Sequence, residues 1–271
     1  MARTALVTGA SSGIGRMVAQ ELNRAGFQVY GAARRVERMA DLKAEGITPV
    51  ALDLTDDASI CGCVEQVLAS AGHLDVLVNN AGYGSYGAIE DVPLAEGRRQ
   101  FDVNLFGMAR LIQLVTPSMR AQHYGKIVNI SSMGGKIWTK FGGWYHATKY
   151  AVEGLSDCLR MELKPFGIDV IVVEPGGIQT DWGIIAARNL KKTSANGAYA
   201  ELANQAADGM MKNYSGSMLS KPELIAKTVR KAVTKRRPRT RYLIGFGAMP
   251  MVWTHKVFGD RVFDWVIRHF S

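Results

Sequence analysis

The sequence predicts an α/β fold in which a parallel sheet of about seven strands has helices on both faces, a doubly wound three-layer sandwich. Three observations predict it: short apolar, β-branched runs recur along the chain, helix-like stretches separate them, and a glycine-rich turn follows the first run. The strand-like runs are 3–8, 27–33, 47–52, 74–79, 126–131, 168–174 and about 241–245. Because no shift in composition marks a linker, we expect residues 1–271 to form one domain.

The first strand, turn and helix predict a dinucleotide site. Residues 3–8 are apolar, the turn contains Gly9, Gly13 and Gly15, and residues 16–24 have helical periodicity. Gly9 would make the turn, Gly13 would let the backbone approach a pyrophosphate, and Gly15 would let the helix pack closely on the strand. The phosphates would lie at the helix N-terminus, where backbone amides are unpaired. This unit is Rossmann-like, and a flexible loop without a ligand is the alternative.

The end of the second strand indicates which dinucleotide is bound. An NAD site usually has an acidic residue there, which binds the ribose 2′-hydroxyl. This chain has Ala33 at the expected position, followed by Arg34 and Arg35, with Arg38 shortly after. An arginine suits a 2′-phosphate through a forked, charge-assisted contact. We therefore predict NADP (NADPH) as the cofactor rather than NAD. The alternative is that these arginines only form a solvated helix start.

Tyr145 and Lys149 predict proton transfer. They stand four residues apart in a proline-free stretch, 145–163, that favours a helix, so both side chains share one face. A free tyrosine has a pKa near ~10, and a neighbouring ammonium lowers it. The phenol can then exchange a proton with a carbonyl oxygen, to which Ser132 donates a second hydrogen bond. The alternative is an exposed pair on an amphipathic helix. We expect His146, a quarter-turn away, to serve packing.

With these motifs the chain resembles the short-chain dehydrogenase/reductase family, from about residue 3 to about residue 245. The matching motifs are Thr8-Gly-x-x-x-Gly13-x-Gly15, Asn79-Asn-Ala-Gly82, Asn104 within Val-Asn-Leu, Ser132, Tyr145-x-x-x-Lys149 and Pro175-Gly176. Within the family, residues 79–182 are most similar to the hydroxysteroid and retinol dehydrogenase type. The resemblance implies transfer of hydride between a nicotinamide cofactor and a carbonyl or secondary alcohol.

The resemblance also implies a role for each matching catalytic residue. Tyr145 is the acid/base, Ser132 orients the substrate oxygen, and Ser131 is only its neighbour at the strand end. Lys149 lowers the pKa of the tyrosine and binds the nicotinamide ribose. Asn104 lies at a helix bend and holds a water that links the lysine to solvent.

For the cofactor, the resemblance places Asp53 and Leu54 at the adenine ring and residues 80–82 along the adenosine ribose, with Asn79 bracing the sheet. Residues 175–180 would wrap the nicotinamide, with the Ile178 backbone and the Thr180 hydroxyl on its carboxamide. The predicted cofactor-binding residues are Gly9, Ser11, Ser12, Gly13, Ile14, Gly15, Arg34, Arg35, Asp53, Leu54, Asn80, Ala81, Gly82, Lys149, Pro175, Gly176, Ile178 and Thr180.

Aromatic side chains near these motifs predict an apolar substrate pocket. Its candidate walls are the loop 83–90 and the side chains of Ile137, Trp138, Phe141, Trp144 and Trp182. A bulky hydrophobic ketone, aldehyde or alcohol, such as a steroid, a retinoid or a lipid-derived carbonyl, would fit; a β-ketoacyl thioester is the alternative. The segment 181–220 reads as irregular, and we expect a mobile lid over the substrate there, or else a plain surface insertion.

The net charge of +9 is concentrated in residues 227–241, which hold eight basic residues and no acidic one. We expect a solvated face there and no nucleic-acid partner, with a lipid surface as the alternative. The tail 246–271 is apolar and aromatic with interspersed arginines, as in an interfacial amphipathic segment, which predicts peripheral membrane contact. Core packing or a pocket wall explains the same residues.

Three cysteines at unpaired spacing, Cys61, Cys63 and Cys158, fit a reducing compartment, so we expect a cytoplasmic protein with no metal site. Subunits of the resembled family associate through helices near 100–122 and 145–163, which implies a homodimer or homotetramer. A non-catalytic NADP-sensing module would share the fold, but the intact catalytic motifs argue against it.

Overall fold

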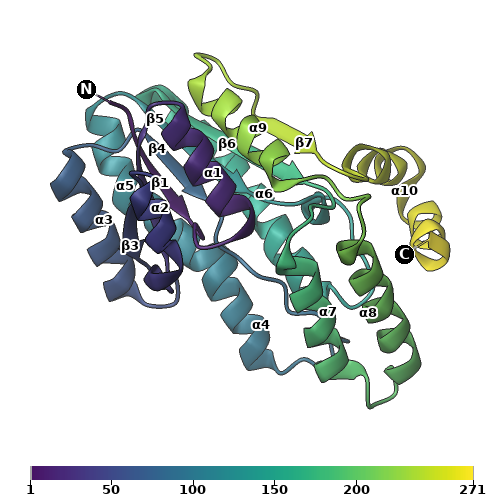
Figure 1. Cartoon of the computed structure of the whole chain (residues 1–271). Helices are drawn as coiled ribbons and strands as arrows, with labels where there is room; N and C mark the ends of the chain where they lie inside the picture. Colours follow the sequence, from purple (N-terminus) through teal and green to yellow (C-terminus); the bar gives the residue numbers. More distant parts are fainter. Residues whose placement is uncertain (1, 271) are drawn as a thin grey trace.

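The computed structural model describes residues 2–270, and these residues contain one seven-stranded sheet with all strands parallel (Figure 1). The strand order is β3-β2-β1-β4-β5-β6-β7, so the chain starts inside the sheet and builds outward in both directions. The strands are β1 (Thr4–Thr8), β2 (Gln28–Ala33), β3 (Thr48–Ala51), β4 (Val76–Asn79), β5 (Gly125–Ile130), β6 (Ile168–Pro175) and β7 (Arg241–Ile244). The predicted fold class is confirmed.

Helices cover both faces of this sheet because its strands are apolar on both sides (Figure 1). In β1, Ala5 and Val7 belong to the core shared with α1 and α9, whereas Leu6 belongs to the core shared with α3, α5 and α6. The helices are α1 (Gly13–Arg24), α2 (Ala40–Ala44), α3 (Asp57–Ala71), α4 (Leu94–Phe101), α5 (Gly107–Ala121), α6 (Gly143–Leu163), α7 (Asp181–Ser194), α8 (Ala200–Ser215), α9 (Pro222–Thr234) and α10 (Ala248–Phe270). Short 3-10 turns lie at η1 (Val36–Met39), η3 (Met133–Gly135) and η4 (Lys164–Phe166), and a π-helical turn, η2 (Asp102–Phe106), joins α4 to α5.

The parallel strands bring the predicted site residues to one edge of the sheet. The carboxyl ends of neighbouring parallel strands lie side by side, and ligands of such sheets bind there. The glycine turn follows β1, Asn80 follows β4, Ser132 lies two residues after β5, and the segment 176–180 follows β6. These four strands are neighbours in the sheet, so the cofactor motifs and the catalytic motifs meet at this edge.

The segment 181–220 is not irregular, and that expectation is wrong. It forms two packed helices, α7 and α8, whose shared core contains Ala186, Leu190, Ala203 and Ala207. Alanine has the highest helix propensity and lets two helices approach closely. The alanines that suggested a loop are therefore the helix–helix contact, and the only turn between them is the short stretch 195–199.

The chain ends in α10, which packs beside the carboxyl-end edge of the sheet (Figure 1). Its direction breaks at Gly259, where φ is 73°. Phe263 and Ile267 are buried against Ile137, so part of this helix does pack on the core. Among the described residues, no helix combines the length and the hydropathy needed to cross a bilayer.

Candidate active site

The glycine turn after β1 has the geometry that the sequence predicts. Gly9 and Gly13 have φ of +70° and +53°, a region that favours glycine. A Cβ on Gly15 would lie 2.4 Å from the carbonyl oxygen of Gly9 and 2.4 Å from the side-chain nitrogen Nδ2 of Asn80. No side chain fits there, so α1 can pack this closely on the turn only with glycine at this position.

The N-terminus of α1 suits a phosphate. Ser12 precedes the helix in an extended conformation, its hydroxyl makes no capping hydrogen bond, and the first turn carries no acidic residue. The first amides of a helix have no partner within it, and the helix dipole adds a partial positive charge. The turn is also open toward Thr180, whose methyl carbon lies 3.4 Å from a Cβ built on Gly13. The predicted pyrophosphate and nicotinamide segments therefore face each other.

The residues after β4 tie the site to the sheet. The Asn80 side chain donates to the carbonyl of Thr8 at 2.9 Å, and the amides of Asn80 and Ala81 both donate to the Thr8 hydroxyl at 3.0 Å. Asn79 instead donates to Asn129 on β5 at 2.9 Å, which braces the sheet as predicted. Residues 80 and 81 thus lie directly beside the start of the glycine turn.

The end of β2 is positively charged. Arg34 and Arg35 are exposed directly after Ala33. Hydrogen bonds from Thr55 are the largest cause of the lowered pKa of Asp53, and the charges of Arg34 and Arg99 lower it further. Arg99, on α4, was not among the predicted site residues. It comes from a helix far from β2 in the sequence, so only the folded chain shows that the charges of two arginines act on Asp53.

Ser132 and Tyr145 face each other at the carboxyl end of β5. The Ser132 hydroxyl hydrogen-bonds to the Tyr145 phenol and also accepts a bond from the Gly134 amide at 3.0 Å. Tyr145 is buried, and burial raises the pKa of its phenol, while the hydrogen bond from Ser132 lowers it. The phenol therefore keeps its proton at neutral pH.

Lys149 hydrogen-bonds the main chain rather than the Tyr145 hydroxyl, and its expected lowering of the phenol pKa stays a prediction. Its ammonium lies 5.9 Å from the centroid of the Tyr145 ring and donates instead to the carbonyl of Ile130 at 2.9 Å. Burial lowers the pKa of Lys149 to about 8, an effect that the nearby Glu153 carboxylate opposes. Helical spacing places Tyr145 and Lys149 on one face of α6. The direction of the Lys149 ammonium is set by its hydrogen bond to the Ile130 carbonyl at the end of β5.

Asn104 lies in the π-helical turn η2, which is the predicted helix bend. Its amide donates to the carbonyl of Tyr83 at 2.9 Å and to the Thr148 hydroxyl at 3.1 Å, while its oxygen accepts from the Tyr83 amide at 3.0 Å. Thr148 is adjacent to Lys149, so this network joins η2 to the catalytic helix. The π turn re-aims Asn104 from the α4–α5 helix toward α6.

The segment after β6 is held by the carboxyl end of β7 and the residues just after it. Gly176 donates to the Ile244 carbonyl at 2.8 Å, and Gly177 donates to the Phe246 carbonyl at 2.8 Å. Ile178 forms a bridge with Ser220, and Thr180 precedes α7. Leu54 is buried, and its carbonyl lies 2.4 Å from a Cβ built on Gly107. The predicted cofactor segments after β1, β4 and β6 thus lie at one edge of the sheet.

Aromatic rings cover Tyr145. Trp182 on α7 lies 4.9 Å from it and Tyr86 lies 6.1 Å from it, measured between ring centroids. Tyr214 on α8 lies 6.3 Å from Trp182 and also acts on the pKa of Tyr145. Phe141 packs at the rim of the same cluster. The helices α7 and α8 therefore place an aromatic cover over Tyr145.

Three predicted pocket residues lie elsewhere, and those assignments are wrong. Ile137 and Trp138 pack against α10, where the Trp138 indole donates to Asp264 at 2.9 Å. The Trp144 ring meets the Phe101 ring edge to face and packs against Gly97 on α4. Neighbouring residues on one helix or turn diverge in direction, which nearness in sequence cannot reveal.

His146 serves packing, as predicted. One ring nitrogen bonds the carbonyl of Gly134 at 2.9 Å, and the other lies 3.0 Å from both the amide and the hydroxyl of Thr139. Burial lowers its pKa. The ring thus holds the loop that follows Ser132 in place.

A buried acidic pair lies behind the catalytic helix. Glu153 and Glu174 are both buried, and Lys136 and Arg241 approach both carboxylates. Burial raises the pKa of Glu174 to about 7, and the neighbouring Glu153 raises it as well. The pair therefore holds a proton near neutral pH.

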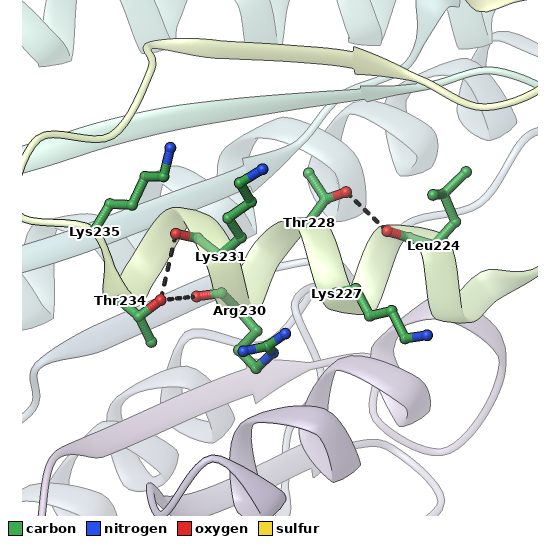
Figure 2. A pocket seen from close by; sticks show the side chains of 7 residues that line it. All are labelled: Leu224, Lys227, Thr228, Arg230, Lys231, Thr234 and Lys235. Carbon is green, nitrogen blue, oxygen red and sulfur yellow. Dashed lines mark hydrogen bonds between the residues drawn. The ribbon is translucent and has the colours of Figure 1, made fainter.

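The basic stretch 227–241 is spread over the surface rather than gathered around one point. A shallow depression on α9 is lined by Leu224, Lys227, Thr228, Arg230, Lys231, Thr234 and Lys235 (Figure 2). Figure 2 shows Lys231 and Lys235 on one side of the helix and Arg230 on the other. Arg230 pairs with Glu21 at 2.7 Å, and Arg241 pairs with the buried acidic residues. This surface lies away from the site.

The described residues contain no group of three or more His, Cys, Asp or Glu side chains that could hold a metal ion. Cys63 is buried, which raises the pKa of its thiol to about 12. Cys61 lies within 3.7 Å of Asp57 and 3.6 Å of Arg110, which also pair with each other.

The fold and the Ser132–Tyr145–Lys149 set can be compared with known proteins. The profile of the short chain dehydrogenase family matches residues 3–189. The chain belongs to the short-chain dehydrogenase/reductase family. It is an oxidoreductase of this family, and the solved short-chain dehydrogenase from Streptomyces avermitilis resembles it with a TM-score of 0.83 at 35% identity, over 99% of this chain and 96% of the other.

Two curated relatives carry substrate names. A 3-ketodihydrosphingosine reductase from Bacteroides thetaiotaomicron is 40% identical over 72% of this chain and 71% of its own length. An NADPH-dependent 3-dehydrocapnine reductase from Ornithobacterium rhinotracheale is 32% identical over 97% of this chain and 95% of its own length. Short-chain dehydrogenases bind nicotinamide cofactors, and similar solved structures hold NADP in some cases and NAD in another.

Proposed function

We propose that this protein is an NADPH-dependent reductase of a ketone on a long-chain, lipid-derived substrate. The observation that carries the proposal is the Ser132–Tyr145 hydrogen bond under the aromatic cover formed by Trp182, Tyr86 and Tyr214. It combines a proton donor with an apolar surface around the reacting group.

The residues at the carboxyl ends of β1, β4, β5 and β6 fit a nicotinamide dinucleotide. The α1 N-terminus and the glycine turn would hold the pyrophosphate, residues 80–82 and Lys149 the riboses, and residues 175–180 the nicotinamide. When bound there, the cofactor supplies the hydride for carbonyl reduction.

Tyr145 is suited to protonate the carbonyl oxygen. Its raised pKa keeps the phenol protonated at neutral pH, which is the form that reduction requires. Ser132 donates a hydrogen bond to the same oxygen and so orients the carbonyl. Lys149, with a pKa of about 8, can return a proton toward the phenol, and the Asn104–Thr148 bonds hold its helix in register.

Arg34 and Arg99 support the preference for NADPH. Both lie close enough to Asp53 for their charges to lower its pKa, and the position after β2 where NAD sites carry an acid is Ala33. A 2′-phosphate would meet two guanidinium groups at this point. The NADPH named for the 3-dehydrocapnine reductase supports the same choice.

The names of two relatives support a long-chain substrate with a ketone near a polar head. A steroid or a retinoid fits the aromatic cover in chemistry but has no such support. A phosphorylated carrier of a β-ketoacyl thioester would need basic residues near the site. The basic loop 235–240 instead precedes β7 and lies at the amino ends of the strands, opposite the site.

We also propose that two or four copies associate through the outer faces of η2, α5 and α6. Phe106, Tyr150 and Met161 are exposed on these elements by 59%, 42% and 74%, which is costly for apolar side chains in a monomer. Sedimentation velocity of the purified protein is the test.

The direct test is a ketone panel read by NADPH absorbance. We expect 3-ketodihydrosphingosine and related long-chain 2-amino-3-ketones to be reduced more efficiently than steroid ketones, retinal or β-ketoacyl thioesters, and NADH to be less effective. The proposal fails if the long-chain ketones are not reduced, or if another class of substrate is clearly preferred.

A further inference from the structure

The outer face of α10 is an apolar stripe. Met249, Trp253 and Val257 follow one another at helical spacing and are 55%, 53% and 61% exposed. Phe258, next to Val257, is 63% exposed, and after the break at Gly259 Val262 is 43% exposed. Two other apolar side chains of α10, Phe263 and Ile267, are buried in the protein. The helix therefore has one set of apolar side chains that the core covers and another that it leaves exposed.

Three exposed side chains of α10 are positively charged. Lys256, Arg261 and Arg268 are exposed, and within the described part of the chain none of them forms an ion pair. The Lys256 ammonium lies 5.1 Å from the Trp253 ring centroid, so charge and apolar surface are adjacent.

The helix also carries two acidic side chains. Asp264 accepts the Trp138 indole hydrogen bond at 2.9 Å, and Asp260 lies 3.0 Å from His255 but stays 78% exposed. The exposed surface of α10 is therefore apolar and carries three cations against the exposed carboxylate of Asp260.

We infer that α10 is a docking surface for an anionic lipid bilayer. Exposed apolar and tryptophan side chains bordered by lysine and arginine are what an interfacial helix needs: the apolar stripe enters the headgroup region while the cations meet lipid phosphates. A second copy of the chain is the weaker occupant. A two-fold contact pairs this surface with the same surface of the other copy, which brings three cations of one copy near three cations of the other.

The position of α10 links this surface to the active site. His255 lies 3.0 Å from the carbonyl of Lys136, and Ile137 is buried under Phe263, so α10 rests on the segment that follows Ser132. The chain also enters the helix directly after Phe246, whose carbonyl holds Gly177 in the proposed nicotinamide wall. A lipid surface bound to α10 is thereby held beside the site. The link to lipid substrates rests on the proposed function, whereas the surface itself does not.

Vesicle flotation of the full-length protein tests the inference. The probes are vesicles of phosphatidylcholine alone and of phosphatidylcholine with an equal part of phosphatidylglycerol. We expect the protein to float with the anionic vesicles and much less with the neutral ones. Trp253→Ser combined with Val257→Asp and Phe258→Ser should raise the lipid concentration for half-maximal binding by about tenfold or more. Lys256→Glu with Arg261→Glu should abolish the preference for anionic vesicles.

Leu202→Ser is the matched control, because it also removes an exposed apolar side chain but in the first turn of α8, outside α10 and outside the proposed subunit contact. It should bind vesicles like the wild type, and thermal melting should show that all variants fold. The inference is overturned if the wild type does not float, or if the triple variant floats equally well. If the wild type does not float and the triple variant is a smaller oligomer by sedimentation, the exposed apolar stripe belongs to a contact with a second copy.

Turnover of a short, water-soluble ketone separates this inference from the proposed function. The α10 variants should retain it, because none of the substituted side chains lies in the catalytic set. If the protein binds anionic vesicles and reduces no ketone, the proposed function fails and the docking surface stands.

Discussion

The indole of Trp182 lies 4.9 Å from the phenol ring of Tyr145, measured between ring centroids. One ring comes from the cover helix α7 and the other from the catalytic helix α6. The Trp182 ring thus packs against Tyr145, and burial is the largest cause of the raised pKa of that phenol. Under the proposed function, this contact joins the aromatic cover to the proton donor.

Replacing Trp182 with alanine should weaken the use of hydrophobic substrates. The substitution removes apolar surface from the pocket and lets water reach Tyr145, so KM for a long-chain ketone should rise by about tenfold. The pKa of the phenol should fall as well, which moves the alkaline limb of the kcat profile to lower pH. Steady-state kinetics across pH measures both effects. Trp182→Phe should retain most of the wild-type KM, and equal KM values for the alanine and wild-type enzymes would exclude the contact from the pocket.

Removing the phenolic hydroxyl should stop turnover without releasing the cofactor. Tyr145→Phe keeps the ring and its contacts but has no proton to donate, so kcat should fall by about 10²- to 10⁴-fold. The affinity for NADPH, followed by cofactor fluorescence, should change little. Tyr150→Phe is the control, since this tyrosine is exposed on the same helix. A Tyr145→Phe enzyme with near-normal kcat would refute the assigned proton donor.

Reversing the charge after β2 should change the cofactor preference. Arg34→Asp removes a cation next to Asp53 and supplies an acid that can bind a ribose 2′-hydroxyl, so NADPH should lose about tenfold or more in kcat/KM relative to NADH. Arg99→Ala should weaken NADPH in the same direction. Arg98→Ala, an exposed neighbour on α4, is the control. An unchanged ratio in Arg34→Asp would argue that the 2′-phosphate lies elsewhere.

The backbone geometry of the site was predictable from local spacing, whereas its side-chain partners were not. The strand–turn–helix order around Gly15 and the helical spacing of Tyr145 and Lys149 depend only on nearby residues. The position of the Lys149 ammonium depends on the carbonyl of Ile130, nineteen residues away. Arg99 likewise reaches the β2 end through the packing of α4. Such contacts join elements that are separate in the sequence, and no periodicity encodes them.

The contacts of Trp138 and of the helices α7 and α8 were likewise not predictable from the sequence. Trp138 follows the catalytic serine closely in sequence, yet its partner is Asp264, which is 126 residues away. The alanines of α7 and α8 suggested a loop, because their value as a close helix contact exists only when the second helix is present. Composition alone therefore predicted the place of the cover but not its structure.

Adding one methyl group at Gly15 should damage both folding and cofactor binding. In Gly15→Ala the new Cβ would meet the Gly9 carbonyl at 2.4 Å, so α1 must move away from the turn that it holds. We expect a loss of about 1–3 kcal/mol in the free energy of unfolding, together with weaker NADPH binding. Gly154→Ala is the control, because nothing lies within 4 Å of its added Cβ in the middle of α6. That variant should be as stable as the wild type or more so. Equal urea midpoints for Gly15→Ala and wild type would contradict the packing argument.

The buried pair Glu153 and Glu174 should make stability depend on pH. Burial and the neighbouring Glu153 raise the pKa of Glu174 from 4.5 to about 7, against the opposing charges of Lys136 and Arg241. The unfolded chain loses this proton near pH 4.5, while the folded chain keeps it until about pH 7. The contribution of this group is therefore fully present below pH 4.5 and declines as the pH rises to 7, by at most about 3 kcal/mol. Glu174→Gln keeps the shape of the protonated form and cannot ionise, so its unfolding midpoint should vary less between pH 5 and 8. A matched Glu162→Gln variant, whose side chain is exposed on the same helix as Glu153, should follow the wild type. If Glu174→Gln and the wild type lose stability in parallel over this range, the shared proton does not exist.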